Sequence, residues 1–138
     1  MGHKVIPEIS RHNKWWIPKY RYLELKYFCL QYSEWKRESF EINRRISTSI
    51  QNGIKREARF SDPTGDEGVR LAGLGSKISL VNKAADMADS EIGKYVLKAV
   101  TEDVSFIKLK TMYEIPCERD MYYDRYRKFF YLLDQMRD

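Results

Sequence analysis

The side chains best suited to recognition chemistry lie near the C-terminal end of the sequence, in residues 105–136. Five of them recur along the outer side of a predicted helix: Arg119, Asp120, Tyr123, Asp124 and Arg127. Arginine is the residue that most often reads guanine in the major groove of DNA, and tyrosine offers stacking or a phosphate contact. This set of residue types therefore indicates contact with base edges.

The rest of the sequence contains no motif that indicates catalysis or metal binding. The sequence has no glycine-rich phosphate loop, no paired-cysteine motif and no histidine–glutamate metal motif. His3 and His12 both lie near the N-terminus, and they do not combine with a nucleophile into a catalytic set. The carboxylates of Glu118, Asp120 and Asp124 alternate with arginines, which is typical of an ion-paired helix surface. We therefore expect a non-enzymatic protein without a cofactor or a bound metal ion.

Residues 105–136 are predicted to fold as a short helix, a tight turn and a longer helix. Ser105 is a good N-cap, because its hydroxyl can accept from the free N–H groups of the first turn. Pro116 cannot continue the first helix, and the second helix then begins near Cys117 or Glu118. Helices joined by so short a turn favour a helix-turn-helix, whose second helix can enter a major groove. A plain helical hairpin gives the same pattern, and the sequence leaves both interpretations open.

The chain as a whole is predicted to be all-α, with about six helices, because apolar residues recur at helical spacing and no strand alternation is present. Before the closing pair, helices are expected over residues 19–31, 34–49 and 66–87, and again after a cap at Asp89 or Ser90. The inner face of the first helix is predicted to be Tyr20, Leu23, Tyr27 and Leu30, with Leu25 and Phe28 as a flank. That of the second is predicted to be Trp35, Phe40 or Ser39, Ile42, Ile46 and Ile50. That of the third is predicted to be Val69, Ala72, Ile78, Val81 and Ala85, widened by Leu71, Leu74 and Leu80. The inner face of the last helix is predicted to be Tyr122, Tyr126, Phe129, Leu133 and Met136.

Three segments organise the predicted chain. An extended N-terminal arm covers residues 1–18, because Pro7 and Pro18 interrupt any helix there. A basic N-terminal helical hairpin covers residues 19–60. A helical domain covers residues 61–138 and ends in the helix-turn-helix.

The arm contains two adjacent tryptophans, Trp15 and Trp16, which have two interpretations. They dock the arm on the helical core, as large aromatic residues usually do. Alternatively, they stack against a base or a protein partner while nearby lysine and arginine side chains meet phosphates. The sequence favours docking of the arm.

Positive charge is concentrated in the N-terminal half of the chain. Residues 1–60 carry 13 Lys and Arg against 6 Asp and Glu, a net charge of +7, whereas residues 61–138 carry 12 against 14, a net charge of −2. This asymmetry indicates an anionic partner such as double-stranded DNA. The residues expected to contact the DNA backbone are Lys108, Lys110, Arg44 and Arg45.

The sequence favours a cytoplasmic protein. No apolar run approaches the roughly 20 residues that a membrane-spanning helix needs. The first ten residues, MGHKVIPEIS, lack the apolar core of a secretory signal. Cys29 and Cys117 show no metal-ligand spacing and fit reduced thiols. We expect no contact with a membrane.

Residues 61–134 resemble small phage and prophage proteins of Gram-positive bacteria, the RinA/ArpU-type late transcriptional regulators. The resemblance is carried by the SDPT boundary at residues 61–64, by the long helix after it and by the closing helical unit. In that unit Ile115 and Pro116 stand where the family has Ile-Ser, and the second helix carries the following polar residues: Arg119, Tyr123 and Arg127. The resemblance implies a terminal helix-turn-helix like the fourth region of bacterial sigma factors, and hence a DNA-binding regulator in a bacterial host cell.

Two other functions remain open from the sequence. A protein-interaction module, such as a phage-encoded inhibitor of a host protein, would use the tyrosine-rich helices and the aromatic N-terminal half as its interface. The near-neutral charge of the last helix favours that hypothesis. A small subunit of a DNA-packaging machine would also be helical and would bind DNA as a ring. A homodimer is the oligomeric state expected of a regulator, because paired half-sites match two-fold symmetry.

Overall fold

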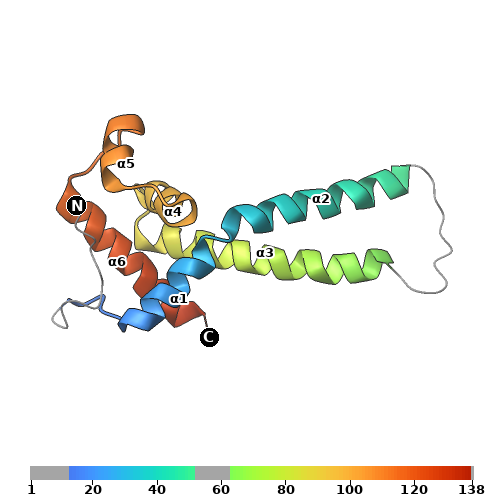
Figure 1. Cartoon of the computed structure of the whole chain (residues 1–138), viewed down its shortest axis with the longest axis horizontal. Coiled ribbons are helices and arrows are strands. Elements are labelled where there is room, and N and C mark those ends of the chain that lie inside the picture. The colour runs from blue at the N-terminus through green and yellow to red at the C-terminus, as the bar shows by residue number, and fades with distance from the viewer. Residues whose placement is uncertain (1–12, 52–62, 138) are drawn as a thin grey trace. The chain divides into compact units, whose positions relative to one another are not determined.

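The computed structural model describes residues 13–51 and 63–137. All of the regular structure in these residues is helical, which confirms the predicted all-α class. Figure 1 shows the six helices of the described chain. Their bounds are α1 Lys19–Cys29, α2 Tyr32–Gln51, α3 Pro63–Ala88, α4 Gly93–Glu102, α5 Phe106–Met112 and α6 Arg119–Met136.

The helices fall into two compact units. Among the described residues, the first contains residues 13–31 and 80–137, and the second contains residues 32–51 and 63–79. Thus α1 belongs with α4, α5, α6 and the end of α3, whereas α2 belongs with most of α3. Within the first unit, α1 packs on α6.

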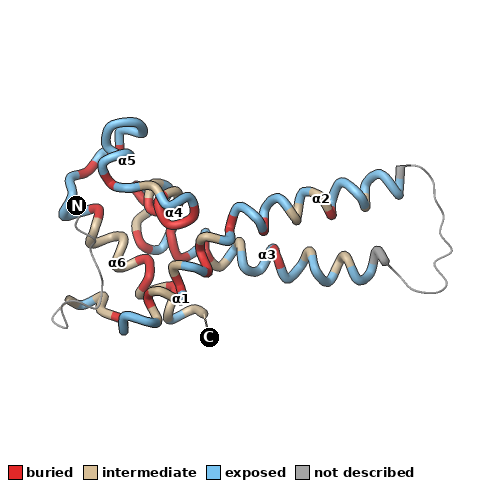
Figure 2. The backbone as a smooth tube through the Cα atoms, in the orientation of Figure 1, coloured by how far each residue is buried: buried red, intermediate tan, exposed pale blue. Residues whose placement is uncertain are grey.

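The first unit holds most of the buried residues, and Figure 2 shows red stretches in α4 and α6. The largest of them come from α6, where Tyr122, Phe129, Phe130 and Leu133 are at most 2% exposed. Of the five residues predicted for the inner face of α6, three are buried: Tyr122, Phe129 and Leu133. The other two, Tyr126 and Met136, are half-buried. The predicted inner face of α6 is confirmed.

The buried side of α1 agrees with the prediction only in part. Leu25 and Phe28, predicted as the flank of the inner face, are buried together with Tyr22. Tyr20 and Tyr27, predicted at its centre, are 77% and 61% exposed. Helix α1 carries aromatic or aliphatic residues on every side, so spacing alone does not identify the side that packs. The side containing Tyr22 is chosen because its ring meets Phe130 of α6, with ring centroids 5.1 Å apart.

In the second unit, α2 and the first part of α3 run side by side in opposite directions (Figure 1). Trp35, Ile42 and Leu74 are buried in this pair. Four residues predicted to face inward are exposed, among them Phe40 at 65% and Val69 at 76%. The other two are Ile50, at 74%, and Ala72. A two-helix pair can bury only a narrow strip of each helix, so the edges of the predicted faces remain in solvent.

Two of the expected helix caps are present. Asp89 Oδ1 accepts hydrogen bonds from the backbone N–H groups of Glu91 and Ile92, at 2.7 and 2.8 Å, just before α4. Ser105 Oγ accepts from the Lys108 N–H at 3.2 Å and caps α5. Side chains that satisfy free backbone donors therefore mark the start of α4 and the start of α5.

Some predictions concern residues outside the described chain. These are residues 1–12 of the predicted arm, with His3, Pro7 and His12, residues 52–60 of the predicted hairpin, and the first two residues of the predicted boundary, 61 and 62. Within the described residues, none of the helices combines the length and the apolar character that crossing a bilayer requires.

Candidate nucleic-acid interface

The connection between α5 and α6 is a tight, defined turn. The backbone N–H groups of Tyr113 and Ile115 both donate to the carbonyl oxygen of Leu109, at 3.2 and 3.1 Å. Between them, Glu114 adopts a left-handed conformation with φ of 51°. This pair of bonds ends α5 in the manner of a left-handed C-terminal cap. Ile115 is then buried, at 1% exposed, which anchors the connection to the core.

Lys110 links the two helices. Its Nζ donates to the carbonyl oxygen of Cys117 at 3.1 Å and lies 3.6 Å from a carboxylate oxygen of Glu118, the N-cap of α6. The sequence predicted a DNA-backbone contact for this lysine. In the structure its ammonium group holds the end of the connection through one hydrogen bond and one ion pair, and the side chain is 42% exposed.

The first turn of α6 is the exposed part of that helix. Arg119 and Asp120 are exposed, and Met121 is 38% exposed. The Arg119 guanidinium lies over the ring of Phe106, 5.1 Å from its centroid, and forms no ion pair with any described residue. Its positive charge is therefore uncompensated and accessible.

Tyr123 lies one turn further along α6 and is half-buried. Its ring is packed among three aromatic rings, with centroid distances of 4.9 Å to Tyr122, 6.1 Å to Tyr126 and 6.2 Å to Phe106. A tyrosine held in this way presents one edge outward while the rest of its ring is fixed. Tyr123, a member of the predicted base-reading set, is therefore only partly accessible to solvent.

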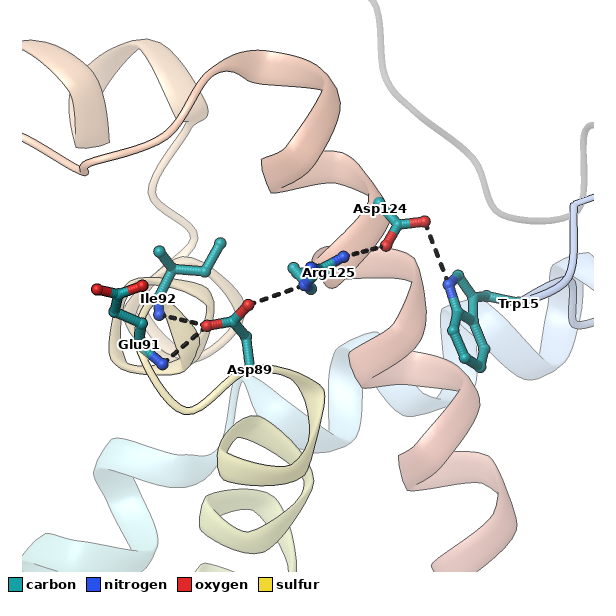
Figure 3. Close-up of polar contacts among 6 residues, drawn as sticks. All are labelled: Trp15, Asp89, Glu91, Ile92, Asp124 and Arg125. Carbon is teal, nitrogen blue, oxygen red and sulfur yellow. Dashed lines mark hydrogen bonds and ion pairs between the residues drawn. The ribbon is translucent and has the colours of Figure 1, made fainter.

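Asp124 belongs to a hydrogen-bonded chain that crosses α6 (Figure 3). Its Oδ1 accepts from Trp15 Nε1 at 3.2 Å, and its Oδ2 accepts from Arg125 Nη1 at 2.5 Å. Arg125 Nε donates in turn to Asp89 Oδ2 at 2.8 Å. Both oxygens of Asp124 are engaged within the fold, so this residue does not face a base edge in the described conformation.

Asp89 is electrostatically adapted to this position. Burial alone would raise the pKa of its carboxyl group, but the backbone N–H of Ile92 and the Arg125 guanidinium outweigh burial and lower the pKa below its ordinary value. The carboxylate is 13% exposed. Asp89 therefore caps α4 and holds α6 through the same charge.

Trp15 covers the middle of α6. Its ring lies 5.3 Å from the ring of Tyr131, and Lys128 Nζ lies 5.4 Å from the Trp15 centroid. The docked position of Trp15 agrees with the docking interpretation of the tryptophans. Arg127 is half-buried, and its Nε is buried without a hydrogen-bond partner among the described residues. Access to Arg127 is therefore restricted.

The remaining predicted backbone contacts lie in different surroundings. Lys108 is exposed on α5, with no ion pair among the described residues. Arg44 and Arg45 belong to the second unit, where Arg44 pairs with Glu41 at 2.7 Å and Arg45 with Glu67 at 2.8 Å. The structure thus brings Lys108 into the same unit as Arg119 and Asp120, and it places Arg44 and Arg45 on α2.

A pocket of about 380 Å³, which was not predicted, lies among α1, α4, α5 and α6. Four tyrosines line it, and the hydroxyls of Tyr22 and Tyr126 are hydrogen-bonded at 2.7 Å. Burial raises the pKa of both Tyr122 and Tyr126, so these phenols remain protonated at neutral pH. The clustering depends on α1 packing against α6, and only the spacing of Tyr122, Tyr123 and Tyr126 could have suggested it.

Among the described residues, no group of three or more histidine, cysteine, aspartate or glutamate side chains is arranged to hold a metal ion. No known family model matches the chain, and no curated protein or solved structure is similar enough to it to count as a match.

Proposed function

We propose that this protein is a non-enzymatic DNA-binding regulator that reads double-stranded DNA with the first turn of α6. The observation that supports this most is the exposure of Arg119 and Asp120 at the start of a helix whose remainder is fixed in the core. A rigidly held helix with a free N-terminal turn is the element that helix-turn-helix proteins place in the major groove. The resemblance of residues 61–134 to phage and prophage regulators points in the same direction.

The surroundings of α6 divide the predicted contact residues by role. Arg119, with its unpaired guanidinium, is the best candidate for guanine contact, and Asp120 and Tyr123 flank it. Lys108 is the candidate phosphate contact, because its charge is exposed and unpaired in the described chain. Asp124 and Lys110 support the position of α6 through their hydrogen bonds.

The test is selection of preferred duplexes from a random library, followed by fluorescence anisotropy at two salt concentrations. Arg119→Ala should cost about 1–3 kcal/mol and relax the preference at one base pair. Lys108→Ala should weaken binding to all duplexes alike. It should also reduce the slope of log K against log salt concentration by about one.

Arg37→Ala is the matched control for Arg119→Ala, because Arg37 is an exposed arginine of α2 without an ion pair in the described chain. It should leave the sequence preference intact. Failure to select any duplex sequence, or selection that Arg119→Ala leaves unchanged, would remove DNA reading by α6.

A protein-binding function is the second candidate, and exposed apolar side chains on the same elements favour it. Ile107 and Met112 of α5 are each 62% exposed, and Met121 of α6 is 38% exposed. Isolated apolar residues at the surface are common, but three on two connected elements suit a partner's apolar side chains. Ile107→Ser and Met112→Ser should abolish capture of a protein partner while leaving duplex selection unchanged. The reverse result would assign these residues to the DNA interface.

A further inference from the structure

We infer that the pocket among α1, α4, α5 and α6 binds a small planar aromatic molecule that carries one negative charge. This site shares Arg119 and Tyr123 with the proposed DNA-reading residues, but its walls also include residues of α1, α4 and α5. Its volume, about 380 Å³, lies within the range of pockets that hold small ligands.

The walls of the pocket are aromatic and apolar. Phe106 and Tyr122 lie side by side with ring centroids 5.1 Å apart, and Phe130 and Val100 contribute further apolar surface. Tyr122 is 2% exposed and Phe130 is fully buried, so these walls are fixed by the core. Flat, rigid aromatic walls favour a planar ring, which can stack or meet them edge to face.

Phenolic hydroxyls lie at the same walls. The hydroxyls of Tyr22 and Tyr126 are hydrogen-bonded to each other at 2.7 Å, and Tyr122 and Tyr123 also line the space. A phenol can both donate and accept a hydrogen bond, so these walls suit a polar group attached to the aromatic ring of a ligand.

The charge of the lining sets the sign of the ligand. The charged residues that line the pocket are Lys26 of α1, Arg119 of α6 and Asp103, which ends α4. None of the three forms an ion pair with a described residue, so the lining carries a net charge of +1. A single carboxylate or sulfonate on the aromatic ring would complement that charge. Asp103 disfavours ligands with a second negative charge.

The experiment uses the full chain with 2-naphthoate as the probe, measured by saturation-transfer NMR and by calorimetry. The matched neutral probe is 2-naphthamide, which has the same ring system without the charge. We expect 2-naphthoate to bind about tenfold more tightly than 2-naphthamide, because only the carboxylate can form a charge-assisted contact with the basic lining.

Variants assign the binding to this pocket. Lys26→Gln should lower the affinity for 2-naphthoate about tenfold and leave that for 2-naphthamide unchanged. Val104→Phe should abolish both, because the added ring fills the space between the walls. The control is Lys94→Gln, since Lys94 is an exposed lysine of α4 outside the pocket lining, and it should bind both probes like the unaltered protein.

Three results would overturn the inference: no saturation transfer to 2-naphthoate, equal affinity for the two probes, or binding that Lys26→Gln and Val104→Phe leave intact. The comparison of the two probes on the unaltered protein decides the matter even if a variant fails to fold. Because no DNA is present, a negative result here is distinct from failure of duplex selection.

Discussion

The guanidinium of Arg125 on α6 donates to the Asp89 carboxylate at 2.8 Å, and the same carboxylate caps α4. One charged group therefore sets both the beginning of α4 and the position of α6 beside it (Figure 3). Since Arg125 also donates to Asp124, the orientation of the first turns of α6 depends on this chain of contacts. Substitution of Asp89 should therefore alter the orientation of the exposed first turn of α6.

The first prediction concerns Asp89→Asn, which keeps a capping oxygen but removes the charge that Arg125 meets. The variant should lose about 1–2 kcal/mol of unfolding free energy at pH 7. The folded-state pKa of Asp89 lies below its ordinary value of 3.8, so this stabilisation is present above pH 3.8 and is lost as the pH falls through the folded-state pKa. Urea unfolding at pH 7 and at pH 3.5 measures the difference, which should shrink at the lower pH.

The control for this prediction is Asp86→Asn, at an exposed position of α3 with no ion pair in the described chain. It should change stability by less than about 0.5 kcal/mol at either pH. A difference between the unaltered protein and Asp89→Asn that is as large at pH 3.5 as at pH 7 would contradict the electrostatic explanation.

The second prediction concerns the indole N–H of Trp15, which donates to Asp124. Trp15→Phe keeps an aromatic ring near Tyr131 and removes the donor. A double-mutant cycle of Trp15→Phe with Asp124→Ala should give a coupling energy of about 1 kcal/mol. Trp15→Phe combined with Asp86→Asn should be additive, because these residues share no contact. Additivity in the first cycle would mean that Trp15 holds α6 through ring packing alone.

The sequence predicted the all-α class, the positions of most helices and the inner face of α6. Local signals suffice for these features: Ser105 caps α5, and apolar residues such as Phe129 and Leu133 recur at helical spacing on α6. The buried side of α1 could not be predicted in this way. Tyr20 and Tyr22 are equally suited to a core by residue type, and only the position of Phe130 on α6 distinguishes them.

The candidate site was predictable only in part for the same reason. Arg119 and Asp124 lie on the same helix and were placed in one base-reading set, yet Arg119 is exposed and Asp124 is hydrogen-bonded on both oxygens. The difference comes from Trp15, a residue 109 positions away in the sequence. Contacts between segments this distant leave no periodic signal in the chain, and the tyrosine-lined pocket was missed for the same reason.

The third prediction concerns Glu114, which adopts φ of 51° in the connection between α5 and α6. Residues other than glycine, asparagine and aspartate rarely adopt this backbone conformation, because their Cβ atom comes too close to the following carbonyl oxygen. Glu114→Gly should therefore raise the unfolding free energy by about 0.5–1 kcal/mol, after the larger chain entropy of glycine is counted. Thermal unfolding measures the shift.

Glu114→Val provides the opposite test at the same exposed position. A β-branched side chain is more strained in this conformation, so the variant should be less stable than the unaltered protein. If Glu114→Gly and Glu114→Val shifted the melting temperature in the same direction, the left-handed turn would not be the cause. Since the turn leads directly into α6, Glu114→Gly should leave duplex selection by Arg119 intact.

The fourth prediction contrasts glycines in two helices. A methyl group at Gly93, the first residue of α4, would overlap the carbonyl oxygen of Ala85 and lie 3.1 Å from its carbonyl carbon. Both atoms belong to the backbone of α3 and cannot move aside without shifting the helix. Gly73, in α3, has no atom within 4 Å of the corresponding position.

Gly93→Ala should therefore destabilise the protein by about 2 kcal/mol or more, as expected for overpacking against backbone. Gly73→Ala should stabilise it by up to about 1 kcal/mol, because alanine is the better helix former and meets open space. Chemical denaturation of the two variants measures both effects with one identical chemical change. Similar shifts of the same sign would show that α4 does not approach α3 closely at Ala85, and the support of α6 through Asp89 would then need a different geometry.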